Sequence, residues 1–251
     1  MEGVVHGHLF LFMDIVFPLG GGSKIDDLEL RYSLRSIEKH ISGVRDIYLI
    51  GKKPEWVKDV YHIEAEDEHP CKETNIYRKV MIACQKPDIS DNFLFFNDDH
   101  FIIHDFEADK FPSFYKGHLL QVLGKMPPYN KYSTCVYQTA MVLRERGFKE
   151  DNYDAHCPII YNKQKFAEVM PTYDWSHRFS FVVKSLYANS VGVAGVKEPD
   201  CKINDPASHE EFKRRLQDRK FFSVGNDAIA QGWHDTMKEL YPNPSRWEIV
   251  K

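Results

Sequence analysis

Apolar, strand-like segments alternate with helix-like segments through the first hundred residues, and this alternation constrains the fold more than any other feature. HLFLFMDIVF (8–17), RDIYLIG (45–51) and VYHIEA (60–65) predict strands. Between and after them, apolar residues recur at helical spacing over residues 25–41 and 73–85. Strands that alternate with helices form parallel βαβ units, which bind ligands at the carboxyl ends of the strands. The pattern therefore predicts an α/β fold with a mainly parallel sheet.

The second half of the chain is less regular. Residues 134–148 and 163–170 predict helices, and a short strand is predicted within residues 156–162. Neither an internal repeat nor a linker interrupts the 251 residues, so we expect one domain that spans residues 1–251. Charged residues make up 28% of the chain and apolar residues 43%, which is typical of soluble globular proteins.

Charge and cysteine content indicate the compartment and exclude some partners. A net charge of -4 argues against a protein-wide positive field for nucleic acid or anionic membrane. The densest basic run, KRRLQDRK (213–220), suits either a solvated helix face or a polyanion site. Five widely spaced cysteines without a CxxC pair favour a reducing compartment. The opening 17 residues lack a basic region and a cleavage site, so we expect a first strand in a cytoplasmic protein without stable membrane insertion.

The strongest sign of chemistry is FLFFNDDHFII (93–103), an apolar run with Asp98 and Asp99 in its middle. Adjacent carboxylates repel each other and are costly to bury without a partner. At a strand end they could hold a hard divalent cation, which binds one or two carboxylates together with substrate phosphates. The alternative is a turn at the strand end with two solvated acids.

The glycine-rich segment PLGGGS (18–23) directly follows the first predicted strand. Its backbone N–H groups could wrap a phosphate at a helix N-terminus, although it matches neither a Walker loop nor GxGxxG. A plain tight turn explains the same residues. Its place at the carboxyl end of a strand favours the phosphate interpretation.

Four further side chains are candidates for the same pocket. His156 precedes an apolar run, so a catalytic and a structural role are both open. Arg178 could bind a phosphate or pack against its aromatic neighbours. Asn226 and Asp227 follow the apolar segment FFSV, as Asp98 and Asp99 follow FLFF. Two such sites predict one shared polar pocket.

In order along the chain, these segments resemble the Stealth family of sugar-phosphate transferases, which includes bacterial capsule enzymes. MDIVFPLGGGS resembles the first block of the family, and DLELRYSLRSIEKHISGVRDIYLIGKKPEWV with NFLFFNDDHFI its second. AHCPIIYNKQKFAEVM with SHRFS is similar to the third block and KFFSVGNDAI to the fourth. The similarity covers roughly half of the residues and spans nearly the whole chain.

The resemblance implies a GT-A-like, Rossmann-related nucleotide-sugar fold with a mixed, mainly parallel sheet. Residues 1–105 would form the nucleotide-sugar-binding half, and residues 106–251 the acceptor and catalytic half. Asp98 and Asp99 would bind Mn²⁺ or Mg²⁺, His156 would be the catalytic base, Arg178 a phosphate contact and Asp227 a further catalytic residue. The donor would contact Pro18, Leu19, Gly20, Gly21, Arg31, Arg35, Asn97 and Asn226.

We therefore expect a metal-dependent glycosyltransferase that moves a sugar from a nucleotide sugar, with UDP as the expected nucleotide, to an acceptor hydroxyl. PLGGGS lacks the Trp and the Asp-Pro usual in the first block, which favours glycosyl transfer. The alternatives are a sugar-1-phosphate transferase that releases a nucleoside monophosphate, and a non-catalytic nucleotide-sugar-binding module.

The acceptor could be a glycan precursor, a small molecule or a hydroxymethylated base in phage-like DNA, within a bacterial or phage-infected cell. The DNA interpretation rests on residues 213–220 and on Tyr129, Tyr132 and Tyr137, which could stack on bases.

Overall fold

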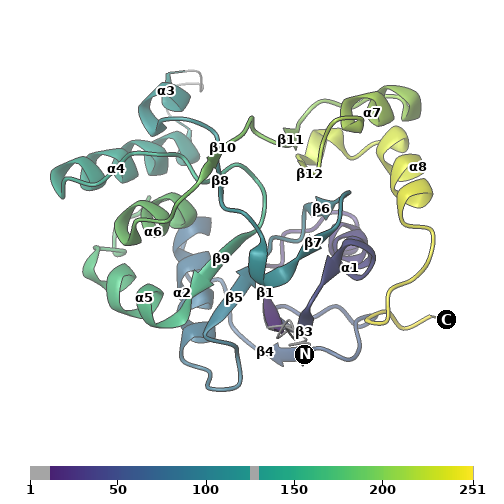
Figure 1. The fold of residues 1–251 in the computed structure, drawn as a ribbon, viewed down its shortest axis with the longest axis horizontal. Coiled ribbons are helices and arrows are strands. Elements are labelled where there is room, and N and C mark those ends of the chain that lie inside the picture. Colours follow the sequence, from purple (N-terminus) through teal and green to yellow (C-terminus); the bar gives the residue numbers. More distant parts are fainter. Residues whose placement is uncertain (1–11, 125–129, 251) are drawn as a thin grey trace, which may run out of the picture.

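The computed structural model describes residues 12–124 and 130–250 (Figure 1). Part of the predicted first strand, residues 8–11, and Tyr129 lie outside this range. The first described strand, β1, comprises Met13–Leu19. The predicted helices and strands of the first hundred residues are found close to their expected positions.

A five-stranded sheet forms the centre of the molecule, in the order β4-β3-β1-β5-β9. Its strands after β1 are β3 (Val44–Gly51), β4 (Tyr61–Ile63), β5 (Asn92–Phe95) and β9 (Ile159–Asn162). All neighbouring strands are parallel except β5 and β9, which are antiparallel. The prediction of an α/β fold with a mixed, mainly parallel sheet is confirmed.

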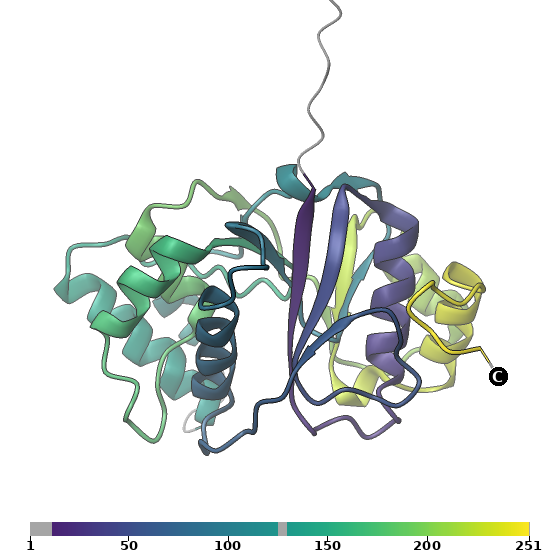
Figure 2. The same cartoon turned by 90° about the horizontal axis from the view of Figure 1, so that it is seen from below.

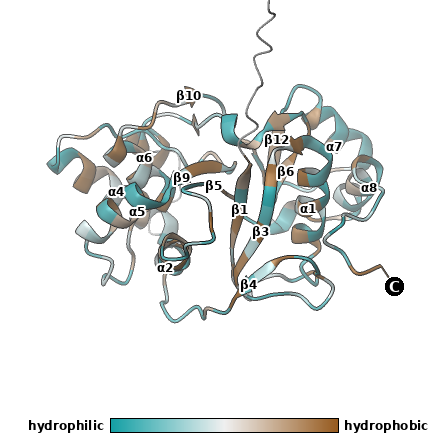
Figure 3. Cartoon of the chain, turned by 60° about the horizontal axis from the view of Figure 1, so that its bottom comes forward, coloured by the Kyte–Doolittle hydropathy of each residue, from teal (hydrophilic) through white to brown (hydrophobic). Residues whose placement is uncertain are grey.

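Side chains of the central strands alternate between two hydrophobic layers. In β1, Ile15 and Phe17 pack on the face covered by α1 (Leu28–His40), whereas Val16 packs on the opposite face. That second face is covered by helices α2 to α6 (Figures 1 and 2). Figure 3 shows β1 and β5 as predominantly hydrophobic, as strands buried on both faces should be. The helices of the second face are α2 (Lys72–Cys84), α3 (Leu119–Leu123), α4 (Lys131–Glu145), α5 (Lys163–Val169) and α6 (Val183–Val191).

A three-stranded sheet of β11 (Lys202–Ile203), β12 (Phe221–Val224) and β6 (His100–Ile102) lies beyond α1. It packs with α7 (His209–Leu216) and α8 (Gln231–Leu240) around Phe101, Phe222 and Trp233. Two short pairs, β2 (Ile41–Ser42) with β7 (Phe106–Glu107) and β8 (Phe114–Tyr115) with β10 (Val196–Lys197), complete the strands of the described residues. Single 3-10 turns occur at Ala108–Lys110, Met170–Thr172 and Asn226–Ala228.

The apolar run 93–103, expected as one segment, is divided between the two sheets. β5 belongs to the central sheet and β6 to the three-stranded sheet, so the chain turns at Asn97–His100. This division places Asp98 and Asp99 at the junction of the sheets, beside the carboxyl ends of β1 and β5. The carboxyl ends are where ligands bind in open α/β sheets.

The segment after α8 is tied to α1 by a buried carboxylate. The side chain of Glu248 is 0% exposed, and its oxygens accept hydrogen bonds from Arg31 Nη1 (2.7 Å) and from Arg35 Nε and Nη2 (2.7 and 2.8 Å). The backbone N–H of Ser245 donates to the same carboxylate at 2.8 Å. A buried charge with this many donors becomes costly as soon as one side of the pair is removed.

We expect Glu248→Ala to lower the free energy of unfolding by about 3–5 kcal/mol, because two guanidinium groups lose their buried partner. Urea denaturation at pH 7 measures the change. Glu38→Ala is the matched control, since the Glu38 carboxylate accepts hydrogen bonds only at the surface. Equal effects of the two substitutions would show that Glu248 is not the anchor.

Candidate functional site

The turn from Asn97 to His100 is closed by two hydrogen bonds within its own residues. The backbone N–H of His100 donates to the Asn97 carbonyl oxygen, and the backbone N–H of Asn97 donates to His100 Nδ1, each at 3.2 Å. Asp98 and Asp99 occupy the two central positions. A turn with both bonds holds the two carboxylates in a fixed orientation at the end of β5.

A cavity of about 360 Å³ lies at this turn. Carboxylates, two lysine ammonium groups and two side-chain amides share its wall with apolar residues from β1, α2 and the loop after β12. Its lining comprises Pro18, Gly20, Gly22, Ser23, Glu29, Asp67, Lys72, Ile76, Asn97, Asp98, Asp99, Lys202, Val224, Gly225, Asn226 and Ile229. We refer to this space as the acidic cleft.

Asp99 is the best-supported carboxylate of the acidic cleft. Ser223 Oγ donates to Asp99 Oδ2 at 2.8 Å, and Lys202 Nζ lies 3.6 Å from the same oxygen. Burial alone would raise the pKa of Asp99, but the positive field of its neighbours, including Lys202, and the Ser223 hydrogen bond lower it to about 2. Asp99 is therefore ionised at neutral pH.

Asp98 has fewer compensating partners. Burial and the adjacent charge of Asp99 raise the pKa of Asp98 to about 6, and Glu29 contributes further repulsion. Ser23 Oγ donates to Glu29 Oε2 at 2.9 Å, and burial raises the pKa of Glu29 as well. This wall of the cleft thus holds an excess of negative charge, which a bound cation would relieve.

The first turn of α2 carries a basic and an acidic residue side by side. Lys72 opens to the acidic cleft; although partial removal from water opposes it, the carboxylates of Asp99 and Asp98 raise its pKa. Glu73 accepts a hydrogen bond from the backbone N–H of Val183 at 3.0 Å. Burial, followed by repulsion from Asp154, raises the pKa of Glu73 to about 7.

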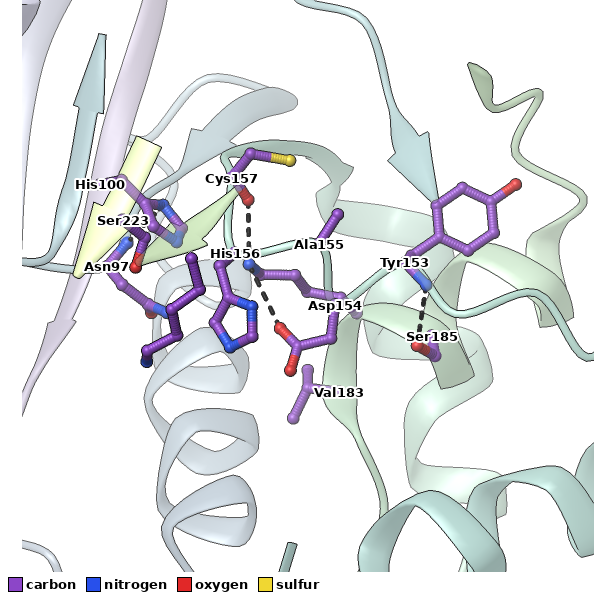
Figure 4. Close-up of polar contacts among 12 residues, drawn as sticks. Asn97, His100, Tyr153, Asp154, Ala155, His156, Cys157, Val183, Ser185 and Ser223 are labelled. Carbon is purple, nitrogen blue, oxygen red and sulfur yellow. Dashed lines mark hydrogen bonds and ion pairs between the residues drawn. The ribbon is translucent and has the colours of Figure 1, made fainter. Parts of the chain in front are cut away.

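A second polar group surrounds Asp154, which lies within electrostatic reach of Lys72 and Glu73. Tyr132 donates its hydroxyl to Asp154 Oδ2, and Lys184 Nζ lies 3.6 Å from Asp154 Oδ1 while donating to the Cys157 carbonyl at 2.9 Å. Although burial opposes it, the charges of His156, when its ring is protonated, and of Lys184 lower the pKa of Asp154. In Figure 4, His156 is drawn between Asp154 and the group of Asn97, His100 and Ser223. We refer to Tyr132, Asp154, His156 and Lys184 as the Asp154 network.

His156 has two unusual features for a residue in a loop. Its φ is 53°, a left-handed conformation that costs free energy for a non-glycine residue and occurs frequently at functional sites. Its Nδ1 lies 2.8 Å from Asp200 Oδ1. His156 does not line the acidic cleft, but in Figure 4 it lies beside Asn97, which does.

The structure brings together many of the residues expected from sequence. Pro18, Gly20, Asn97, Asp98, Asp99 and Asn226 line the acidic cleft. Leu19 and Gly21 line an adjoining cavity of about 410 Å³ that shares Gly20 and Asp67 with it. In contrast, Arg31 and Arg35 bind Glu248 and are absent from the cleft wall. A sequence does not reveal that a distant glutamate will bind these two arginines.

Besides His156, two further expected catalytic residues lie outside the cleft wall. Asp227 is exposed in the turn Asn226–Ala228. Arg178 is exposed, with its guanidinium carbon 5.5 Å from the centroid of the Phe179 ring. Its loop is nevertheless held at the start of α2, because Thr74 Oγ1 and Ser180 Oγ lie 2.7 Å apart.

Sequence reasoning missed Lys72, Lys202, Asp154 and Asp200. Lys72 and Lys202 lie in short polar segments without an apolar run to mark them. Asp154 and Asp200 precede His156 and Lys202 by two residues, in YDAH and PDCK. Of these four residues, only Asp154 could have been noticed in the sequence, because it lies two residues before the candidate base His156.

The acidic cleft offers carboxylate oxygens to a divalent cation. Among residues 12–124 and 130–250, no group of three or more His, Cys, Asp or Glu side chains is placed to hold a metal ion. Mg²⁺ commonly needs only one or two carboxylates, with substrate phosphates and water as further ligands. Asp98 and one oxygen of Asp99, with the excess negative charge around them, fit that kind of site.

Three of the five cations in the basic run 213–220 bind neighbouring acids. Lys213 Nζ lies 2.6 Å from Glu239, and Arg214 and Arg215 both bind Glu211. Tyr132 is bound to Asp154, whereas Tyr137 is 50% exposed. Separately, the helices of the described residues include none with the length and apolar character needed to cross a membrane.

Known proteins similar to this chain were found by sequence comparison. A capsular polysaccharide phosphotransferase of Streptococcus thermophilus is 27% identical over 149 residues, which are 55% of this chain and 62% of that protein. A capsular polysaccharide phosphotransferase of Actinobacillus suis is 29% identical over 96 residues, or 34% of this chain and 26% of its own length. No family profile matches the chain. The partial matches agree with the resemblance to the Stealth family.

We expect Glu73→Gln to raise the free energy of unfolding by roughly 2–3 kcal/mol at pH 8 and by much less at pH 5. The folded state holds the Glu73 proton up to a pKa of about 7, so stability is lost as the pH rises from 4.5 through 7. Glutamine mimics the protonated form. Urea denaturation at both pH values, with Glu66→Gln at an exposed position as control, measures the difference; a gain that is equal at both pH values would contradict the assignment.

Proposed function

We propose that this chain is a sugar-phosphate transferase. It would bind a nucleotide sugar in the acidic cleft and transfer the sugar-1-phosphate to an acceptor hydroxyl, with release of a nucleoside monophosphate. The atoms balance in one displacement: the acceptor oxygen forms a bond to the sugar-linked phosphorus, and the bond from that phosphorus to the bridging oxygen breaks. The acceptor loses one proton to a base.

The observation that carries the proposal is the composition of the acidic cleft. Lys72 and Lys202 face the same cavity as Asp98 and Asp99, at the carboxyl ends of parallel strands. Phosphoryl transfer needs positive charge on the transferred group and a fixed position for it, and little covalent chemistry from the protein. The two lysines supply such charge. The names of the capsular polysaccharide phosphotransferases that the chain partly matches support the same reaction class.

Each group of the cleft then has a defined task. Lys72, at the N-terminal end of α2 where the helix dipole is positive, and Lys202 would bind phosphate oxygens. Asp98 and Asp99 would hold Mg²⁺ or Mn²⁺, which supplies charge neutralisation for the diphosphate when bound. The glycine-rich loop at Gly20 and Gly21, where the adjoining cavity begins, would receive the nucleoside. The nucleotide is expected to be UDP-linked on the resemblance alone.

His156 would accept the proton of the acceptor hydroxyl. With Nδ1 bound to Asp200, Nε2 is the ring nitrogen left for a substrate proton, and none of the described residues forms a hydrogen bond with it. General bases of this kind contribute about 10²–10⁴-fold to the rate. The names of the relatives favour a glycan hydroxyl as the acceptor.

Glycosyl transfer is the second candidate, because the first block PLGGGS departs from the phosphotransferase pattern. The same cleft would then hold the nucleoside diphosphate as the leaving group, and the acceptor would attack the anomeric carbon. The two reactions differ in the nucleotide that they release. A non-catalytic binding module would release neither.

We expect incubation with a panel of nucleotide sugars and Mg²⁺ or Mn²⁺ to release a nucleoside monophosphate from one donor, measured by chromatography with and without a capsular glycan acceptor. Asp99→Asn should lower this rate at least 10²-fold, because the cleft loses its ionised carboxylate. Asp91→Asn, at the opposite end of β5, is the matched control. Release of a diphosphate would assign glycosyl transfer instead, and no release with any donor and acceptor would favour the binding module.

We expect His156→Asn to reduce transfer about 10²–10⁴-fold while the donor Kd, measured by calorimetry, stays within about twofold. Asparagine tolerates the left-handed backbone that His156 adopts, so the change removes the base without adding strain. His104→Asn, at an exposed histidine, controls for the loss of an imidazole. Full activity of His156→Asn would remove His156 from the mechanism.

A further inference from the structure

We infer that Asp200 is a positioning residue that fixes the ring of His156 with Nε2 free to take a proton. This inference rests on the proposed function, in which His156 is the base. Sequence reasoning did not single out Asp200, and it contacts none of the residues that line the acidic cleft except Lys202, which follows it by two positions.

Both carboxylate oxygens of Asp200 have hydrogen-bond partners. Oδ1 lies 2.8 Å from His156 Nδ1 and accepts the backbone N–H of Lys202 at 3.2 Å, while Oδ2 accepts Lys116 Nζ at 2.7 Å. The Lys116 side chain is only 6% exposed. Although burial opposes ionisation, the hydrogen bond to His156 and the charge of Lys116 lower the pKa of Asp200 to about 2. An ionised carboxylate is a hydrogen-bond acceptor only, so His156 must donate from Nδ1.

The tautomer of His156 follows from this contact. A neutral imidazole carries one proton, and when Nδ1 holds it, Nε2 is an acceptor. Lys116 makes the arrangement robust, because it occupies Oδ2 and leaves Oδ1 for the ring. Asp154 and His100 also lie within electrostatic reach of His156, and Lys184 lies beside Asp154. None of these three replaces the direct hydrogen bond from His156 Nδ1 to Asp200.

The two residues after Asp200 align the same segment with the acidic cleft. Cys201 Sγ lies 3.0 Å from the Ala155 carbonyl oxygen and 2.9 Å from that of His156, which supports the left-handed backbone at His156. Lys202 reaches Asp99. Three consecutive residues therefore make three contacts: Asp200 binds the His156 ring, Cys201 binds the His156 backbone, and Lys202 reaches Asp99. Together they fix the position of His156 relative to Asp99.

Asp200→Asn is the sharpest test, because it changes one oxygen to NH₂ at nearly constant shape. Lys116 needs an acceptor, so the amide oxygen should take the Oδ2 position and the NH₂ group should face His156. The ring must then accept at Nδ1 and carry its proton on Nε2, where it cannot act as a base. Lys116→Met in the same chain removes the competing donor and should restore part of the original tautomer.

The tautomer is read directly from the ¹⁵N chemical shifts of the neutral imidazole, with His156→Asn used to assign the signals. We expect the Nδ1–H form in the native protein, the Nε2–H form in Asp200→Asn and a partial return in the double variant. This measurement requires no turnover, so it remains decisive if the proposed function fails. An Nε2–H ring in the native protein, or an unchanged ring in Asp200→Asn, would overturn the inference, and the native measurement holds even if the variant does not fold.

If transfer is observed, Asp200→Asn should lower kcat about 10²–10⁴-fold with KM for the donor nearly unchanged. Asp218→Asn is the matched control, since Asp218 lines the same cavity as Asp200 without contacting His156. In the His156→Asn background the substitution at Asp200 should have no further effect on kcat. An independent loss in that background would show that Asp200 acts on structure and not through the ring.

Discussion

The carboxylate of Asp99 must stay ionised at the junction of two sheets, and the surrounding structure depends on how that charge is held. β5 and β6 belong to different sheets, so the turn between them cannot be left open to water on all sides. Ser223 from β12 and Lys202 from β11 both bind Asp99. The contacts that stabilise the charge therefore also attach the three-stranded sheet to the central one.

The first turn of α2 connects this junction to the Asp154 network. Burial is the largest influence on the pKa of both residues: the carboxylates of Asp99 and Asp98 raise the pKa of Lys72 in spite of it, and repulsion from Asp154 adds to it at Glu73. Both residues sit at one helix terminus, so the charges of the acidic cleft and those of the Asp154 network influence each other over a short distance. In the proposed reaction, the groups that bind the donor phosphates and those around the base would therefore be electrostatically coupled through this terminus.

Local patterns predicted much of the fold and part of the site. Continuous apolar runs mark strands such as β1 and β3 because both faces of the sheet are buried, and the pair Asp98-Asp99 is conspicuous because an apolar run surrounds it. The sequence did not predict α6 and α8. In α6, residues 183–189 are all buried, so its sequence does not alternate between a polar and an apolar face. α8 follows a polar turn. Contacts between residues distant in sequence could not be predicted from local patterns. Arg31 and Arg35 bind Glu248 more than 200 residues away, and Asp200 binds His156, which lies 44 residues earlier in the chain.

The charges of the acidic cleft explain why the proposed donor would need a cation. Among the described residues, Glu29, Asp67, Asp98 and Asp99 face the cavity together with Lys72 and Lys202, and Lys79 binds Asp67 at 2.6 Å, which leaves an excess of one negative charge when all seven groups are ionised. The diphosphate of a nucleotide sugar adds further negative charge, and the repulsion between like charges strengthens as water is displaced. The lysines alone cannot offset both. A dication between Asp98, Asp99 and the diphosphate would balance the excess, so the same acids that repel the donor in the absence of the ion would position it when the ion is present.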